Sequence, residues 1–190
     1  ELDTNPFLRA SNESVISAIQ KKFNINEPRE DGHSFIANSL IKSKNAALKS
    51  GIPSIADDSG LCILSLGNQP GIYSARWAYK NDYHSAFQKI KNSLEKKGLA
   101  VNEQCAKFIC VVALIDKEKN EYIFKGSLEG KLTLPPRGVN GFGYDPIFIP
   151  INQKKTLGQI TSKLKNSFSH RKKALDALLS HSIFKNYFAK

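Results

Sequence analysis

Two adjacent carboxylates, Asp57 and Asp58, follow a short apolar run and lead into Ser59 and Gly60. We expect a short strand over 52–56 that ends at this acidic pair, because the end of a strand presents side chains rigidly to a cleft. Hard divalent cations bind one or two carboxylates together with substrate phosphates, so the pair is a candidate Mg²⁺ site. The alternative is that these residues cap a turn or a helix, which the same residue types do well.

A glycine-rich segment over 138–146 carries two aromatic residues and an acid. Phe142 and Tyr144 can stack on a flat base, which is worth about 1–3 kcal/mol per base, and Asp145 can accept hydrogen bonds. The segment lacks the glycine spacing of a dinucleotide-binding motif or of a P-loop. The alternative is a tight turn that carries two aromatic residues of the core.

A basic cluster lies at the start of the last predicted helix, which covers residues 169–181. With Ser169 as its N-cap, Lys165, His170 and Arg171 gather at a helix N-terminus, where backbone amides and the helix dipole favour anions. An arginine there can bind a phosphate or a carbonyl group through its forked donors. A histidine in such a position is as often structural as functional.

The chain has 190 residues, with 28 Lys and Arg against 17 Asp and Glu, and a net charge of +11. This surplus favours a polyanionic partner such as nucleic acid, a membrane surface or a phosphorylated small molecule; a surface rich in lysine for solubility is the alternative. No basic tail, membrane-spanning run or secretory signal is expected. Three cysteines without metal-binding spacing indicate reduced thiols in a cytosolic protein.

Predicted helices and strands are interspersed without repeats or long linkers, which indicates an α/β fold with a mixed sheet in a single domain. Periodicity and apolar runs distinguish the two kinds of element. The predicted helices cover residues 12–23, 35–51, 82–97 and 169–181. The predicted strands cover residues 52–56, 61–66, 107–115, 121–134 (as one bent strand or a pair) and 147–149.

In this order, the segments resemble the inosine triphosphate pyrophosphatase family, also called Ham1-like or XTP/dITP diphosphatases. The resemblance rests on SFIANSLIKSKNAA, GIPSIADDSGL, PGIYSARWA, KFICVVALI, GFGYDPIFIP and KNSFSHRKKALDAL. It implies an ITPase-like fold, with a long central mixed β-sheet between two α/β lobes, and a cytoplasmic homodimer without nucleic-acid or membrane partners. It also implies a hydrolase that uses Mg²⁺ to convert ITP, dITP and XTP to the monophosphate and pyrophosphate.

The same resemblance implies roles for individual residues. Asp58 would be the catalytic base and a Mg²⁺ ligand, with Asp57 as its acidic neighbour and Asn38 and Lys42 as supporting residues. The implied substrate contacts are Ser59, the base-pocket residues Phe142, Gly143, Tyr144 and Asp145, and the residues that hold phosphate and the purine 6-oxo group, Lys165, His170 and Arg171.

The chain departs from the family's pattern in two places. Nothing in the sequence supplies the N-terminal strand and phosphate-binding loop, so residues 1–190 are expected to form a single ITPase-like domain without them. Ala37 occupies the position where a Mg²⁺-binding glutamate is expected; the alternative ligand is an acid of the preceding loop, Glu27, Glu30 or Asp31. Both departures bear on the activity of the chain and not on its fold.

Two other functions remain open at this stage. A basic, non-catalytic nucleic-acid-binding module would use the same aromatic and basic residues, and its binding would depend steeply on salt. A Maf-type nucleotide pyrophosphatase would act on other bases, although the ADDSG and SHR segments argue against it.

Overall fold

The computed structural model describes residues 25–78, 80 and 82–188. Its strands form one five-stranded sheet in the order β2-β1-β3-β4-β5. The strands are β1 (Ser54–Ile63), β2 (Gln69–Pro70), β3 (Cys105–Ile115), β4 (Glu121–Leu132) and β5 (Phe148–Pro150). The predicted α/β class is therefore confirmed. We predicted a mixed sheet, whereas the pairings among the described strands are all antiparallel.

The acidic pair lies in the middle of a strand. We predicted two strands, 52–56 and 61–66, separated by the acidic segment, but β1 is continuous over ten residues. It pairs with β3 along its whole length, and Asp57 and Asp58 lie opposite Val112 and Val111. The ladder of hydrogen bonds with a long apolar strand therefore outweighs the poor strand propensity of the acidic and glycine residues.

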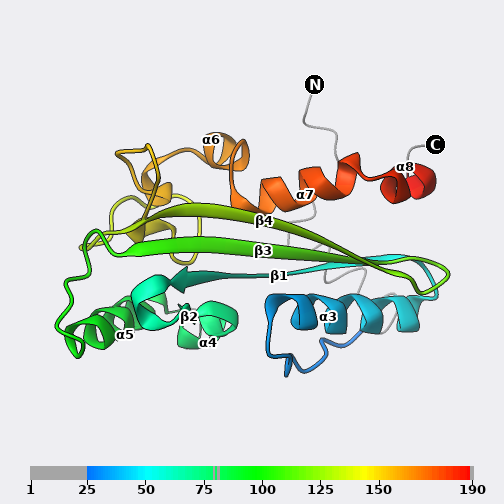
Figure 1. Cartoon of the computed structure of the whole chain (residues 1–190), viewed down its shortest axis with the longest axis horizontal. Coiled ribbons are helices and arrows are strands. Elements are labelled where there is room, and N and C mark those ends of the chain that lie inside the picture. Colours follow the sequence, from blue (N-terminus) through cyan, green and yellow to red (C-terminus); the bar gives the residue numbers. More distant parts are fainter. Residues whose placement is uncertain (1–24, 79, 81, 189–190) are drawn as a thin grey trace.

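Helices cover the sheet on both faces, as Figure 1 shows. Near one end of the sheet, α3 lies against one face, and α7 and α8 lie on the opposite face. Near the other end, α4, α5 and α6 surround the strands together with the connecting loops. The helices are α3 (Phe35–Ser50), α4 (Ser74–Trp77), α5 (Tyr83–Glu95), α6 (Ser162–Asn166), α7 (His170–Ser180) and α8 (Ser182–Phe188).

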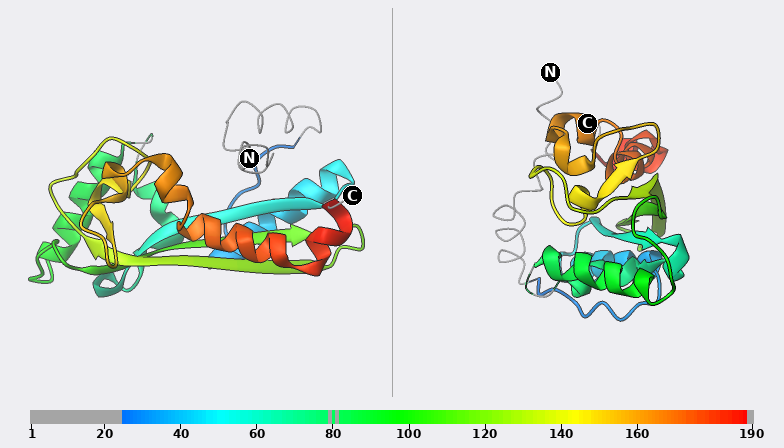
Figure 2. Two further views of the ribbon diagram at one scale, coloured as in Figure 1. Left: turned by 90° about the horizontal axis from the view of Figure 1, so that it is seen from above. Right: turned by 90° about the vertical axis from the view of Figure 1, so that its left-hand side faces the viewer.

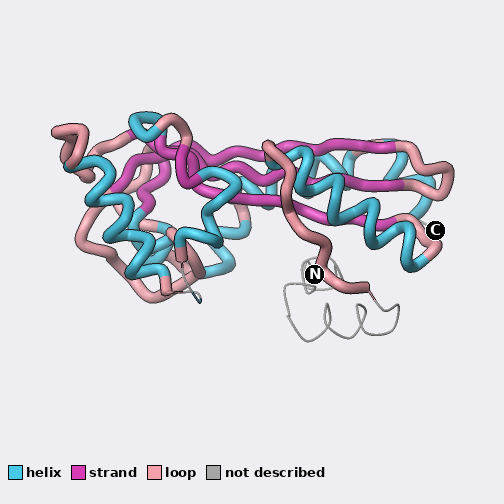
Figure 3. Tube along the Cα trace, turned by 90° about the horizontal axis from the view of Figure 1, so that it is seen from below, coloured by secondary structure: helices cyan, strands magenta, loops and turns pink. Residues whose placement is uncertain are grey.

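The molecule is elongated along β1, β3 and β4, with a lobe at each end (Figures 2 and 3). The two lobes have separate cores. One core packs α5 against residues such as Leu61 and Phe148, and the other packs α7 against Cys110, Val112 and Phe124. The long strands therefore connect two packed bodies, which is the two-lobed arrangement expected from the resemblance.

Local signals mark the ends of two predicted helices, α3 and α7. Ser34 and Ser169 accept hydrogen bonds from the first turns of α3 and α7, and Gly51 ends α3 in the left-handed conformation that favours glycine. At Gly126 a Cβ atom would lie 2.0 Å from the His170 carbonyl oxygen, so this glycine allows α7 to start directly on β4.

Three other predictions have different outcomes. The segment 121–134, predicted as one bent strand or a pair, contains one strand, β4, which ends at Leu132. The predicted helix over 12–23 and the expectations about the start of the chain lie outside the described residues. Within the described part of the chain, no helix has the length and apolar character needed to cross a membrane.

Candidate active site

Asp58 is buried against α3. Its side chain faces this helix, where Asn38 Nδ2 donates to Oδ2 over 3.2 Å and Lys42 Nζ donates to Oδ1 over 3.3 Å. Asn38 and Lys42 lie four residues apart on α3, so they share one face of the helix. Burial raises the pKa of the Asp58 carboxyl, against the opposing effects of Lys42 and Asn38. The structure therefore brings together Asp58, the predicted catalytic base, and its two predicted supporting residues.

Glu30, in the loop before α3, belongs to the same group of side chains. Its Oε1 lies 2.8 Å from Lys42 Nζ, so the ammonium group of Lys42 is shared by the carboxylates of Glu30 and Asp58. Arg76 of α4 donates to the backbone carbonyl of Glu30 and so ties this loop to the other lobe. Sequence reasoning offered Glu30 only as one of three loop acids, because its proximity to Asp58 depends on these long-range contacts.

The oxygen atoms of this group suit a hard cation. Asn38 Oδ1 is buried and has no hydrogen-bond partner among the described residues. It faces the loop, since a Cβ on Gly32 would lie 2.6 Å from it. The described residues contain no group of three or more His, Cys, Asp or Glu side chains arranged to hold a metal. Two carboxylates and an amide oxygen nevertheless fit Mg²⁺, which completes its coordination with waters and substrate phosphates.

Position 37 lies beside this group. Ala37 is partly exposed, and its Cβ would be 2.7 Å from a Cβ built on Gly32. The loop of Glu30 therefore packs directly over the residue that stands at the expected glutamate position. A carboxylate from the loop is already present near Asp58 without one from position 37.

Asp57 and Ser59 point to the opposite face of the sheet, toward α7. Asp57 Oδ2 accepts hydrogen bonds from Ser59 Oγ at 2.8 Å and from Arg171 Nη2 at 3.1 Å. Successive side chains of a strand alternate between faces, so a mid-strand acidic pair cannot share one cleft wall. The structure therefore separates the two acids that the sequence placed together.

The glycine-rich loop forms a compact turn around Asp145. Gly141 has a φ of 76°, and a Cβ there would lie 2.0 Å from Asp145 Oδ2. Asp145 is 2% exposed; it accepts a hydrogen bond from the Phe142 amide at 2.8 Å and forms an ion pair with Lys165. Phe142 is exposed, and its ring lies below two cations, with Lys165 Nζ 4.3 Å and Arg171 Cζ 5.7 Å from the ring centroid.

The other residues predicted in this loop have different surroundings. Tyr144 is buried, its hydroxyl donates to the Ser74 carbonyl over 2.8 Å, and its ring meets Tyr83 edge-on at 5.3 Å. Burial raises the pKa of the Tyr144 hydroxyl. Its side chain therefore belongs to the core, and Phe142 is the exposed aromatic residue of the loop. Gly143, in the left-handed conformation, contributes backbone beside Tyr83.

His170 is a buried, neutral imidazole. It is 5% exposed and stacks on Phe108, with ring centroids 4.8 Å apart and an interplanar angle of 11°. Burial, together with the positive charges of Arg171 and Lys165, lowers its pKa to about 3. Its Nδ1 is buried without a partner among the described residues. At neutral pH, His170 therefore contributes a polar, uncharged group next to the cations.

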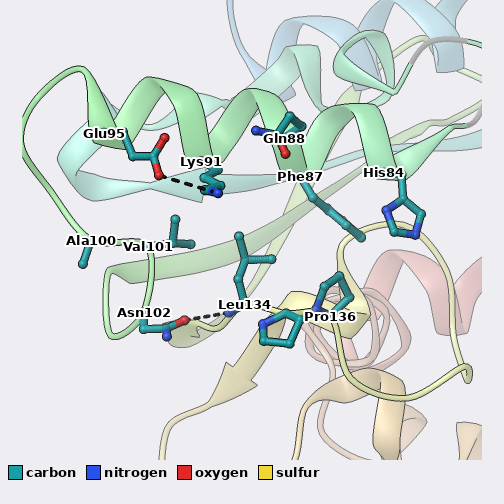
Figure 4. A pocket seen from close by; sticks show the side chains of 11 residues that line it. His84, Phe87, Gln88, Lys91, Glu95, Ala100, Val101, Asn102, Leu134 and Pro136 are labelled. Carbon is teal, nitrogen blue, oxygen red and sulfur yellow. Dashed lines mark hydrogen bonds and ion pairs between the residues drawn. The ribbon is translucent and has the colours of Figure 1, made fainter.

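A separate hollow of about 510 Å³ lies between α5 and the loops around residues 100–102 and 134–136, as Figure 4 shows. Its lining includes Phe87, Lys91 and Asn102. None of the candidate site residues predicted from the sequence lines this hollow. The residues that could act on a phosphorylated substrate lie instead on both sides of β1.

Comparisons with known proteins identify the family of the chain. The sequence profile of the Ham1 family matches residues 4–181. A dITP/XTP pyrophosphatase of Zymomonas mobilis is 42% identical over 155 residues, which are 81% of this chain and 74% of that protein. A dITP/XTP pyrophosphatase of Coxiella burnetii is 39% identical over 162 residues, 84% of this chain and 80% of that protein.

Solved structures are also similar. The structure of a HAM1 protein from Coxiella burnetii superposes with a TM-score of 0.78 at 35% identity, covering 88% of this chain and 92% of that one. The structure of a nucleoside-triphosphatase, a dITP/XTP pyrophosphatase from Mycobacterium abscessus, superposes with a TM-score of 0.68 at 32% identity, covering 90% of this chain and 96% of that one.

Proposed function

Because this chain belongs to the Ham1 family, we propose that it hydrolyses the deaminated purine nucleotides ITP, dITP and XTP to the monophosphate and pyrophosphate. The observation that carries the proposal is the buried carboxylate of Asp58, joined through Lys42 to the carboxylate of Glu30. Two carboxylates brought together by Lys42 form an anionic group of the kind that a metal-dependent reaction on a triphosphate requires. The family match favours this enzyme over a nucleic-acid-binding module or a Maf-type pyrophosphatase.

The phosphoryl chemistry is assigned to the α3 side of β1. Asp58 and Glu30 would hold Mg²⁺, with the amide oxygen of Asn38 close by; the bound cation would neutralise charge on the phosphates. Asp58 accepts a proton from the water that attacks the α-phosphorus. The bond from that phosphorus to the bridging oxygen of the β-phosphate breaks, and pyrophosphate leaves. The raised pKa of Asp58 suits a group that must take up a proton.

Recognition of the base is assigned to the α7 side. Phe142 offers an exposed ring for stacking on the purine, and Lys165 and Arg171 place positive charge beside it. An N–H donor of Arg171 can bind the 6-oxo group of hypoxanthine or xanthine. The 6-amino group of adenine is itself a hydrogen-bond donor, so it cannot pair with the N–H donor of Arg171. Both groups would stay unpaired, which disfavours ATP.

Pyrophosphate release from a panel of nucleoside triphosphates, with and without Mg²⁺, tests the proposal. We expect release from ITP, dITP and XTP that requires the cation, and much slower release from ATP and GTP. Equal rates on all five, or none on the three deaminated nucleotides, would refute it. The proposal extends to a single domain, a homodimer and a cytoplasmic location, as the resemblance implies; sedimentation equilibrium tests the dimer.

A further inference from the structure

The two adjacent acids of β1 face different chemical surroundings. Asp58 faces α3 and the proposed cation site, where Asn38 and Lys42 bind its two oxygens. Asp57 faces α7, on the other side of the sheet, and its ion pair there is with Arg171. The alternation of β1 therefore keeps Asp57 away from the side where the phosphoryl chemistry is assigned.

Three donors converge on one oxygen of Asp57. Oδ2 accepts from Ser59 Oγ at 2.8 Å, from Arg171 Nη2 at 3.1 Å and from Cys110 Sγ at 3.7 Å. Asp57 is thus an acceptor that is held by its own strand, by β3 and by α7.

Arg171 has more donors than the one that Asp57 accepts, and Cys110 also lies within hydrogen-bonding reach of its guanidinium group. The guanidinium group has five N–H donors in a fixed plane, and one of its nitrogens is bound to Asp57. The side chain is 40% exposed, and Cζ lies 5.7 Å from the centroid of the Phe142 ring. A base stacked on Phe142 would therefore meet a guanidinium group whose direction is set by the carboxylate of Asp57.

We propose that Asp57 is a positioning residue for base selection: it fixes the guanidinium of Arg171 so that its free donors face the 6-oxo group of the purine. Asp57 takes no part in proton transfer or in cation binding. This inference rests on the proposed function. It adds Asp57 as a residue that determines specificity, on the face of the sheet opposite to that of Asp58.

Asp57→Ala tests the inference, with Asp57→Asn, which keeps a neutral acceptor, as the graded variant. The matched control is Asp176→Ala. This change breaks a different ion pair of α7, the exposed pair between Lys172 and Asp176. The measurements are kcat and KM for ITP and ATP with Mg²⁺. We expect Asp57→Ala to lower the ratio of kcat/KM for ITP over ATP by about tenfold, equivalent to about 1.4 kcal/mol, with kcat on ITP within about twofold of the wild type.

The effect of Asn should lie between that of Ala and the wild type, and the control should leave the ratio unchanged. In an Arg171→Ala background, Asp57→Ala should lower the ratio no further, because the two residues act as one unit. A fall of kcat that is equal on both substrates, or losses that add in the double variant, would overturn the inference.

Failure of the proposed function gives a different pattern. If the wild-type protein releases no pyrophosphate from ITP, dITP or XTP, the proposed function is refuted, independently of the results for the Asp57 variants. Calorimetric affinities for IMP and AMP need no turnover and still test Asp57. Weaker IMP binding by Asp57→Ala with unchanged AMP binding supports the positioning role, and equal affinities of wild type and variant for IMP overturn it.

Discussion

Replacing His170 with glutamine should remove one source of acid sensitivity from this protein. The folded chain holds the imidazole neutral down to about pH 3 because of its burial and the neighbouring cations. In the unfolded chain, a histidine binds a proton near its ordinary pKa of about 6.5. Between these values the unfolded state binds the additional proton, so the folded state loses stability as the pH falls from about 6.5 toward 3.

The size of the effect follows from the same two pKa values. Each pH unit inside the window changes the free energy of unfolding by about 1.4 kcal/mol. Between pH of about 7.5 and 4.5, only the part below about 6.5 contributes, which gives a loss of about 2–3 kcal/mol from this one residue. Such a loss is a large share of the stability of a typical domain, about 5–15 kcal/mol.

Urea unfolding of the wild type and His170→Gln at both pH values measures the difference. Other groups also titrate in this range, but they do so in both proteins, so the comparison isolates His170. A constant offset between the two proteins has no bearing, since glutamine changes the packing on Phe108 at every pH. If the two proteins lose the same free energy of unfolding over this interval, the imidazole is not held neutral and the reasoning fails.

The remaining predictions concern the proposed cation site. Asp58→Asn should abolish pyrophosphate release from ITP while far-UV circular dichroism stays unchanged, because the amide removes the proton acceptor and an anionic ligand; turnover near the wild-type level would remove Asp58 from the mechanism. Glu30→Gln should raise the half-saturating Mg²⁺ concentration by about 10–100-fold and weaken Mn²⁺ binding seen by electron paramagnetic resonance; unchanged values would leave Glu30 as a partner of Lys42 only. Ala37→Glu should leave half-saturating Mg²⁺ unchanged, because Glu30 already supplies a second carboxylate; a lower value would show that residue 37 reaches the cation.

The elements that could be predicted from the sequence are those fixed by local signals. Gly51 and Ser169 mark helix ends, and the structure uses both of them. The predicted start of α7 also located His170 and Arg171 in the first turn of that helix, because Ser169 caps it. Local chemistry of this kind does not depend on which strand pairs with which.

The place of Glu30 in the site could not be predicted from the sequence, because it depends on tertiary contacts. Glu30 is held near Asp58 by Lys42, and its backbone by Arg76, which is 46 residues away in the chain. Arg76 belongs to a segment, PGIYSARWA, that the sequence does not connect with the loop of Glu30. Nothing in the loop's own composition distinguishes Glu30 from Glu27 or Asp31.

The position of the acidic pair within its strand determines what the pair can do. If β1 ended at Ala56, as the sequence predicted, both acids could turn toward one cleft and share a cation. Because β1 continues to Ile63 and stays paired with β3, the pleat sends Asp58 to α3 and Asp57 to α7. In the proposed mechanism these two adjacent acids have different tasks, proton transfer for Asp58 and orientation of Arg171 for Asp57. Strand pairing, which no single segment of sequence encodes, is what places each carboxylate in its own surroundings.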